Sequence, residues 1–198
     1  MGENMARGAL NATLANSAEL MAQLNGLEDK SEKAIKATIN QLRNRAPGWV
    51  GQEVANVYGI KKAEIKAAGG KKSAGSISLG GYTVDSLYLE YKGRVLTPTH
   101  FKMKPKERKS KGYEVSAEIF KGQRKSLGHN VFLGQSGDSG TPSIPFKRVG
   151  RSRLPIEAVK TLSIPQMITN KEVNEAIYAR ISEEAEKVLK NQISRFSK

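Results

Sequence analysis

Apolar positions in this chain follow a helical period towards both ends and a period of two in the middle. The first helical pattern covers residues 29–46, and its apolar face carries Ile35, Ile39 and Leu42. Residues three or four positions apart share one face of a helix, so this spacing predicts an amphipathic helix. Either Asp29 or Ser31 can cap its first turn.

A Pro-Gly pair at residues 47 and 48 follows that pattern. Proline lacks the backbone N–H that a helix interior needs, so we expect the first helix to end here. The stretch 49–58 has valines at spacings of four and three residues, which predicts a second helix. A short basic helix is expected over residues 60–68, where a Gly-Gly pair terminates it.

The end of the chain carries the longest helical pattern, over about residues 170–197. Thr169 and Glu172 fit a capping box, and Asn170 is an alternative capping residue. The apolar positions recur every three or four residues and form one stripe: Val173, Ile177, Ile181, Ala185, Val188, Leu189, Ile193 and Phe196. This pattern predicts a terminal helix with one buried face.

Between residues 77 and 132 the apolar positions alternate instead. Leu87, Leu89 and Tyr91 form one alternating set, and a second set is formed by Tyr113, Val115, Ala117 and Ile119. Such alternation is typical of half-buried antiparallel strands, and residues 131–133 should form another. The sequence therefore predicts an α+β fold, with a small antiparallel β-sheet packed by N-terminal helices and a long C-terminal helix.

The chain divides into an arm and one domain. Residues 1–26 carry a loose helical stripe of Leu and Met, so we expect a helical arm that is stable only when packed on something. Residues 27–198 form a single α+β domain. Two loops should interrupt this domain, a basic loop at 102–112 and a flexible Gly/Ser loop at 134–143.

The charge balance narrows the set of partners. The 198 residues include 33 Lys and Arg against 19 Asp and Glu, a formal net charge of +14, which favours polyanions or acidic protein surfaces as neighbours. The chain has no cysteine, so disulfides and thiolate chemistry are excluded. It has no apolar run of the roughly 18 residues that cross a membrane. No secretion signal is recognisable, and we expect a protein made in a cytoplasm.

Short motifs that resemble functional ones lack their partners. GDSG at residues 137–140 matches the nucleophile loop of trypsin-like proteases, but no carboxylate follows His100 or His129 in the order a triad needs, so we expect a turn. The stretch 67–75 hints at a phosphate-binding loop, yet a helix precedes its glycines, and a basic linker able to touch phosphate is expected. Two histidines without further ligands form no metal site. We expect a non-enzymatic protein with no cofactor and no metal.

The densest charge lies in a basic block from residue 92 to residue 125, with eleven Lys and Arg against three Glu. Its members with possible contacts to DNA or an acidic partner are Arg94, Lys102, Lys104, Lys106, Arg108, Lys109, Lys111, Arg124 and Lys125. The block is either a solvated hairpin tip or a basic surface that faces one of these partners. Aromatic residues do not interleave with it, so stacking on single-stranded nucleic acid is not expected.

Residues 146–167 form a second candidate for contact, because a basic run is followed there by an apolar segment bounded by two prolines. The segment has nothing that can do chemistry, since it lacks Cys and His and has one carboxylate. We therefore expect it to dock against another subunit. The residues expected to make this contact are Arg148, Arg151, Arg153, Pro155, Ile156, Val159, Leu162, Ile164 and Met167.

Several segments, in their order, resemble the minor tail protein Z family of long-tailed phages. They are KAIKATINQLRNRA (residues 33–46), GIKKAEIKAA (59–68), GRVLTPTHFKMKP (93–105), VFLG (131–134) and FKRVGRSRLPIEAVKTLSIPQM (146–167), followed by the terminal helix. The likeness covers about residues 27–198. Residues 1–26 and the Gly/Ser loop depart from the family pattern. The family has no catalytic residues to transfer.

The resemblance implies a structural virion protein that is assembled in the host cytoplasm. Such a protein completes the head-proximal end of the tail and supports head–tail joining at the neck. The implied partners are copies of itself in a six-membered ring, the tail terminator, the head-completion protein and the phage genome DNA in the channel, with no membrane. The alternative is a free basic nucleic-acid-binding domain that contacts duplex phosphates.

Overall fold

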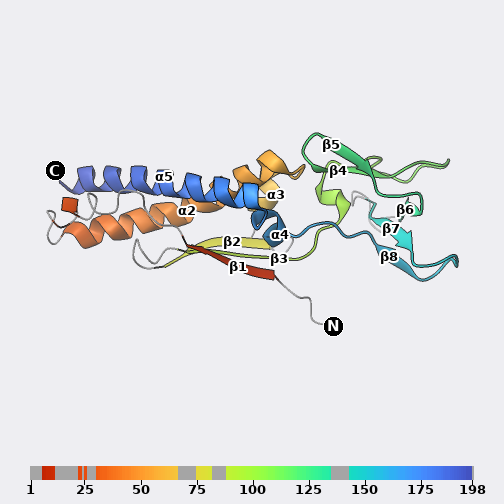
Figure 1. The fold of residues 1–198 in the computed structure, drawn as a ribbon, viewed down its shortest axis with the longest axis horizontal. Helices are drawn as coiled ribbons and strands as arrows, with labels where there is room; N and C mark the ends of the chain where they lie inside the picture. The colour runs from red at the N-terminus through yellow and green to blue at the C-terminus, as the bar shows by residue number, and fades with distance from the viewer. Residues whose placement is uncertain are drawn as a thin grey trace.

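The structure, a computed structural model, describes residues 6–11, 22–23, 25, 30–66, 75–81, 88–134 and 143–197. The molecule is elongated and has two parts along its long axis (Figure 1). One part, the helix lobe, has two long helices over a three-stranded sheet. The other part, the β lobe, is built from five short strands. The α+β class predicted from the sequence is confirmed.

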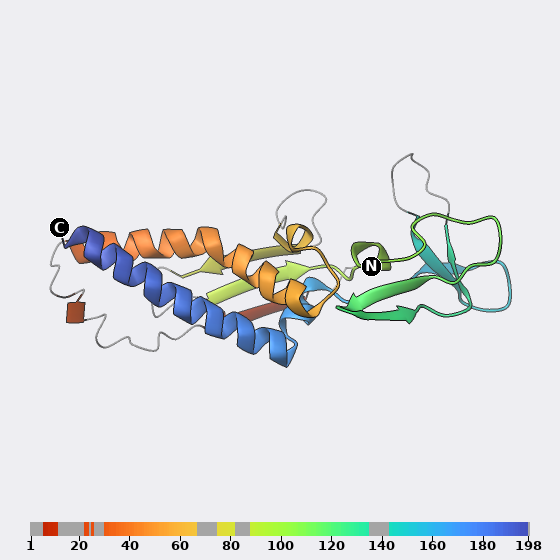
Figure 2. The same cartoon turned by 90° about the horizontal axis from the view of Figure 1, so that it is seen from above.

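The helix lobe contains both long helices of the chain. Its helices are α2 (Ser31–Val57), α3 (Lys62–Lys66), α4 (Ile164–Ile168) and α5 (Lys171–Phe196). Its strands are β1 (Ala6–Asn11), β2 (Gly75–Gly80) and β3 (Tyr88–Gly93), paired antiparallel in the order β1-β3-β2. Figures 1 and 2 show α2 and α5 side by side across one face of this sheet, the predicted arrangement.

The apolar stripes of the two long helices meet in the core of the helix lobe. Leu42 and Val50 of α2 and Ile177 and Ile181 of α5 are at most 1% exposed. The strands contribute Ile77, Leu79, Leu89 and Tyr91, which lie two residues apart and so point to one face. The stripe expected from residue 173 to residue 193 of α5 is buried as predicted. Asn170 caps this helix by accepting from the Glu172 N–H at 3.1 Å, so the alternative cap is the one present.

Pro47 lies inside α2, which runs without a break from Ser31 to Val57. The prediction that the Pro-Gly pair ends the first helix is therefore wrong. An interior proline costs a helix about 3 kcal/mol. Here Ala46 before the proline and Val50 and Val54 after it are all buried. Packing of this face against α5 and the sheet stabilises one continuous helix. The N-cap residue is Lys30, which makes no side-chain cap hydrogen bond, and Asp29 lies outside the described residues.

Residues 6–11 form a strand, which corrects the expectation of a helical arm over residues 1–26. β1 pairs with β3 from Ala6↔Gly93 to Asn11↔Tyr88. A loose helical stripe is a weak preference, and a ladder of backbone hydrogen bonds beside an existing strand overrides it. Residues 22, 23 and 25 are helical, and the rest of the arm lies outside the described residues.

The β lobe has its own small core. Its strands are β4 (Ser116–Phe120), β5 (Gln123–Ser126), β6 (Val131–Leu133), β7 (Pro145–Arg148) and β8 (Ile156–Ala158). β4 pairs with β5, and β6-β7-β8 form a separate antiparallel sheet. The core is formed by Met103, Val115, Ala117, Val131 and Leu133. The predicted strands at 113–119 and 131–133 are both present, although the first begins at Ser116.

The two lobes are joined by backbone pairing at several points. Gly59 donates its N–H to the Ile119 carbonyl at 2.9 Å, and Lys121 donates to the Val57 carbonyl at 2.9 Å. A Cβ on Gly59 would lie 1.9 Å from the carbonyl oxygen of Glu118, so only glycine permits this approach. Leu96 pairs in the same way with the returning chain, where its carbonyl accepts from the Thr161 N–H at 2.8 Å. The junction therefore fixes the β lobe against the end of α2.

Candidate binding surfaces on the β lobe

The positive charge of the chain is concentrated in one third of its length. Residues 94–160 hold 15 Lys and Arg against 5 Asp and Glu, so they carry +10 of the net +14. In the described part of this region, only Lys102, Arg124 and Lys147 form ion pairs with a carboxylate. Cations of this region line two of the openings in the described structure, one at the junction of the lobes and one on the β lobe.

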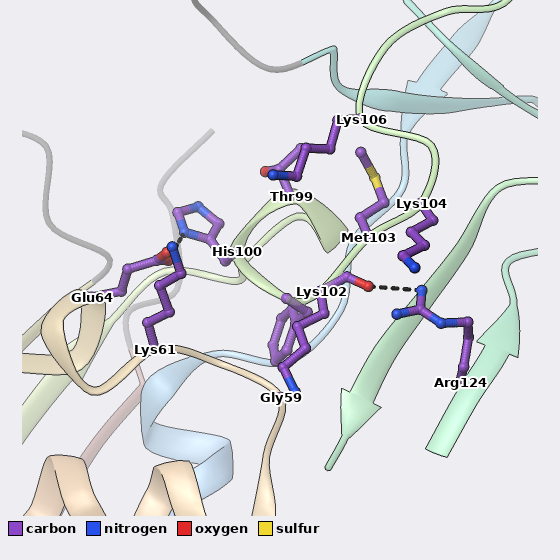
Figure 3. Close-up of a pocket in the computed structure, with 11 residues that line it drawn as sticks. Gly59, Lys61, Glu64, Thr99, His100, Lys102, Met103, Lys104, Lys106 and Arg124 are labelled. Atoms are coloured by element: carbon purple, nitrogen blue, oxygen red, sulfur yellow. Dashed lines mark hydrogen bonds and ion pairs between the residues drawn. The ribbon is translucent and has the colours of Figure 1, made fainter. Parts of the chain in front are cut away.

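The first opening, the inter-lobe cavity, has a volume of about 580 Å³. Such a volume is within the range of roughly 300–1,000 Å³ typical of ligand pockets. Its cationic lining residues are Lys61, Lys102, Lys104, Lys106 and Arg124. Figure 3 shows them arranged around the opening, with Lys61 on the side of the helix lobe and the head groups of Lys104 and Arg124 pointing toward each other on the opposite side.

Strand geometry explains why these cations share one surface. The segment before the basic loop pairs with β4, where Lys104 and Ser116 exchange both backbone hydrogen bonds at 2.8 Å. This pairing fixes the segment that carries Lys102 and Lys104 along the cavity, where Met103 between them also lines the opening and packs into the β-lobe core. Arg124 reaches across from β5 and donates to the Lys102 carbonyl at 2.9 Å.

Glu118 is the carboxylate that pairs with two of these cations. It accepts from Lys102 at 2.9 Å and lies 3.8 Å from Arg124. The pKa of Glu118 is lowered, first because the Gly122 N–H donates to it and then because Lys102 does. Glu118 is therefore charged at neutral pH and offsets part of the positive charge of Lys102 and Arg124.

His100 is hydrogen-bonded to a carboxylate of the helix lobe. It lies in the 3₁₀ turn η3 (Pro98–His100), and its Nδ1 is 2.8 Å from Glu64 Oε2. The Thr99 hydroxyl also lines the cavity and contacts the Thr97 hydroxyl at 2.7 Å. Among the described residues, neither His100 nor Glu64 bonds to the Thr99 hydroxyl.

The second opening is a groove of about 710 Å³ on the β lobe, between the basic loop and the β6-β7-β8 sheet. Its cationic lining residues are Arg108, Lys109, Lys111, Arg148 and Arg153, and the lining contains no Asp or Glu. The Tyr113 hydroxyl accepts from the Leu133 N–H at 3.0 Å, which fixes the end of the loop beside β6. The exposed His129 also lines the groove.

Beyond the groove, the β7–β8 hairpin ends in a tip at residues 148–156. Its apolar side chains are open to solvent, since Leu154 is 68% exposed and Val149 is 56% exposed. Arg148 donates to the Arg153 carbonyl at 2.8 Å, and its guanidinium lies 5.3 Å from the centre of the Phe132 ring. The tip thus places apolar side chains beside arginines in a hairpin that its own contacts hold in shape.

The structure divides the six cations of the predicted basic loop between these two surfaces. Lys102, Lys104 and Lys106 line the inter-lobe cavity, and the other three line the groove. Arg94 and Lys125 of the basic block are exposed but line neither opening. The loop therefore contributes to two separate openings and does not form one continuous surface.

The predicted docking segment divides in a similar way. Arg148, Arg151, Arg153, Pro155 and Ile156 are exposed at the tip. Ile164 and Met167 are fully buried within the chain itself, so the expectation that they contact another subunit is wrong. They belong to α4, which begins with a capping box between Ser163 and Gln166. Val159 and Leu162 are half-buried against the two cores.

The helix α4 was not predicted, although the sequence contains a signal for its start. A serine followed three residues later by glutamine, with proline in the first turn, is a helix start. The expectations for the loops at 67–74 and 135–142, which include GDSG, lie outside the described residues. Within the described ranges, no group of three or more His, Cys, Asp or Glu can hold a metal ion. No helix there is long and apolar enough to span a membrane.

Searches against protein-family models, curated protein sequences and solved structures find no match to this chain. The function proposed below therefore rests on the two surfaces described above and on the resemblance in the sequence.

Proposed function

We propose that this chain is a non-enzymatic assembly protein of a phage virion. In this proposal it completes the head-proximal end of the tail and supports head–tail joining at the neck. The observation that carries the proposal is the tip, where Leu154 and Val149 are exposed beside arginines. Exposed apolar residues rimmed by charge are typical of protein interfaces, in which arginine is enriched.

The groove beside the tip indicates what kind of partner surface fits there. It offers five cations and no carboxylate, so an acidic partner surface with apolar side chains complements both features. Leu154, Val149 and Ile156 would supply the buried contact, and the groove cations would set the orientation. Each side chain fully removed from water contributes about 1.5–3 kcal/mol to such a contact.

The resemblance supplies the proposed assembly. A six-membered ring of this chain would surround the DNA channel of the neck, between the head-completion protein and the tail terminator. Six copies of a region with a net charge of +10 repel one another, and DNA in the channel or an acidic neighbour relieves that repulsion. The alternative function, a free basic domain on duplex DNA, is supported by the same charge but leaves the apolar tip without a role.

Sedimentation velocity of the purified chain tests this proposal. The wild type should form ring-sized oligomers, alone or with acidic neck proteins. Leu154→Asp should remain folded, because an exposed substitution changes stability by about 0.5 kcal/mol or less, and should sediment as a monomer.

The matched control is Val95→Asp, which places the same charge on an apolar residue that is 45% exposed away from the tip. It should assemble like the wild type. A wild type that stays monomeric with these partners, or a Leu154→Asp variant that assembles normally, contradicts the proposed function.

A further inference from the structure

We propose that the inter-lobe cavity binds phosphate groups, supplied either by a nucleic-acid backbone or by a free polyphosphate. The inference does not rest on the proposed function, because the cavity lies apart from the tip and has a different lining. Its evidence is the imbalance of charge around one opening that backbone pairing holds in shape.

The charges around the cavity do not cancel. Glu118 pairs with Lys102 and Arg124, and the Glu64 carboxylate is hydrogen-bonded to His100. The three other cations, Lys61, Lys104 and Lys106, form no ion pair among the described residues. Lys61 comes from the helix lobe and the other two come from the β lobe, so cations without an ion pair lie on both sides of the opening (Figure 3).

The positions of these lysines are set by the backbone. Lys104 belongs to the residue pair that exchanges two hydrogen bonds with Ser116. Lys61 follows Ile60, which bridges to Phe101 on the opposite side of the junction. Holding like charges at a fixed place costs free energy through repulsion, and a bound oxyanion reverses the sign of that interaction.

The charge of the lining suits a phosphate. Five Lys and Arg line the opening against one carboxylate, Glu64. Lysine ammonium groups bind phosphate as point charges without a demand for planar geometry, and a phosphate with several acceptor oxygens can meet lysines arriving from different directions.

The test compares two variants that lose the same charge. One variant is Lys61→Gln, Lys104→Gln and Lys106→Gln together. The control is Lys30→Gln, Lys33→Gln and Arg45→Gln, which are exposed on or next to α2 and form no ion pair within the described ranges. The probes are a short labelled DNA duplex, measured by anisotropy over a salt series, and inorganic tripolyphosphate, measured by calorimetry. Poly-glutamate is the non-phosphate polyanion.

For the duplex, the cavity variant should lose affinity, and the slope of log affinity against log salt should fall by about 1 for each lysine that contacts a phosphate. The α2 control should keep nearly the wild-type slope. This result supports the site with a nucleic-acid backbone as its source. Loss of tripolyphosphate binding with unchanged duplex binding supports the site with free polyphosphate as its source.

Two results would overturn the inference. In the first, the cavity variant and the α2 control bind both phosphate probes equally. In the second, the three substitutions in the cavity weaken the binding of poly-glutamate as much as the binding of the duplex. The lysines would then attract any polyanion through charge, without preference for phosphate. If the chain forms no rings but gives the expected binding results, the proposed function is wrong and the phosphate site is still supported. The two proposals can therefore fail independently.

Discussion

The two lobes treat their charged residues in opposite ways. In the helix lobe, cations and carboxylates pair along and between the helices, for example Lys187 with Glu183 at 2.6 Å and Arg180 with Glu53 at 3.0 Å. In residues 94–160, cations outnumber carboxylates three to one, and most described cations have no carboxylate partner. Outside residues 94–160 the chain holds 18 Lys and Arg against 14 Asp and Glu, which is much closer to balance. The β lobe is balanced only when something else supplies negative charge. The difference separates the part that holds the fold from the part that meets a partner.

The cores differ in the same direction. Among the described residues, the core of the helix lobe joins two long helices, α4 and the sheet with 22 buried residues, whereas that of the β lobe has five. A small core gives a correspondingly small stabilisation, since the hydrophobic contribution scales with buried apolar area. The β lobe therefore depends on its attachment to α2 through Gly59 and to the returning chain through Leu96. The following substitutions test this dependence.

The largest effect is expected at the centre of the helix lobe. Ile181→Asp places a charge without a partner at a position that is 1% exposed, which should lower the free energy of unfolding by about 4 kcal/mol or more. Ala179→Asp adds the same charge to an exposed position of α5 and should change stability little. Denaturant unfolding measures both. If the two variants unfold alike, the face of α5 is not buried and the comparison between the lobes fails.

Sequence patterns predicted the helix lobe better than the β lobe for a physical reason. The stripe of α5 and the alternation of Leu89 and Tyr91 repeat a simple period over enough residues to be recognised. The strands β7 and β8 have three or four residues each, too few for a period to emerge. Pro47 failed as a stop signal because a local cost was outweighed by packing that no local pattern encodes.

The candidate surfaces show the same limit. The sequence located the basic loop and the arginines around residue 150, since charge density is visible in any window. It could not show that Lys104 and Lys109 belong to different openings, because that depends on how the loop crosses the junction. Lys61 was not predicted to belong to a binding surface. It lies far from the basic block in the sequence and reaches the cavity from the helix lobe only in the folded chain. The sequence did not reveal that Ile164 and Met167 are buried, because they follow the exposed tip closely along the chain.

An intermediate effect is expected at the junction. Gly59→Ala would bring a Cβ against the Glu118 backbone, so the pairing of Gly59 with Ile119 must open or shift. Overpacking of this kind costs about 1–3 kcal/mol. Hydrogen exchange should show faster exchange in β4 and the small core, with α2 and α5 still protected. Deprotection of all elements together would show that the lobes unfold as one unit, against the comparison drawn above.

Gly48→Ala is the matched control for this substitution. A Cβ at Gly48 meets nothing within 4 Å, and the residue lies within α2. Alanine is preferred to glycine inside a helix by about 1 kcal/mol. This variant should therefore be equal to or more stable than the wild type, with no change in the exchange of the β lobe.

The smallest effect concerns Glu118, the one carboxylate that pairs with cations of the inter-lobe cavity. Its pKa in the folded chain is lowered from the ordinary value of 4.5 by the Gly122 N–H and by Lys102. A group with a lowered folded pKa contributes stability above its unfolded pKa, and this contribution is lost as the pH falls through the folded value. Glu118→Gln should therefore be less stable than the wild type at neutral pH, and the difference should shrink below about pH 4.5. Glu114→Gln, at an exposed carboxylate with no ion pair among the described residues, is the control for the loss of one negative charge. Removing the negative charge of Glu118 also leaves Lys102 and Arg124 unpaired, so the same variant should bind tripolyphosphate more tightly if the cavity holds phosphate. A Glu118→Gln curve parallel to the wild type at every pH would mean that this pair adds nothing, and that the β lobe stabilises none of its charges internally.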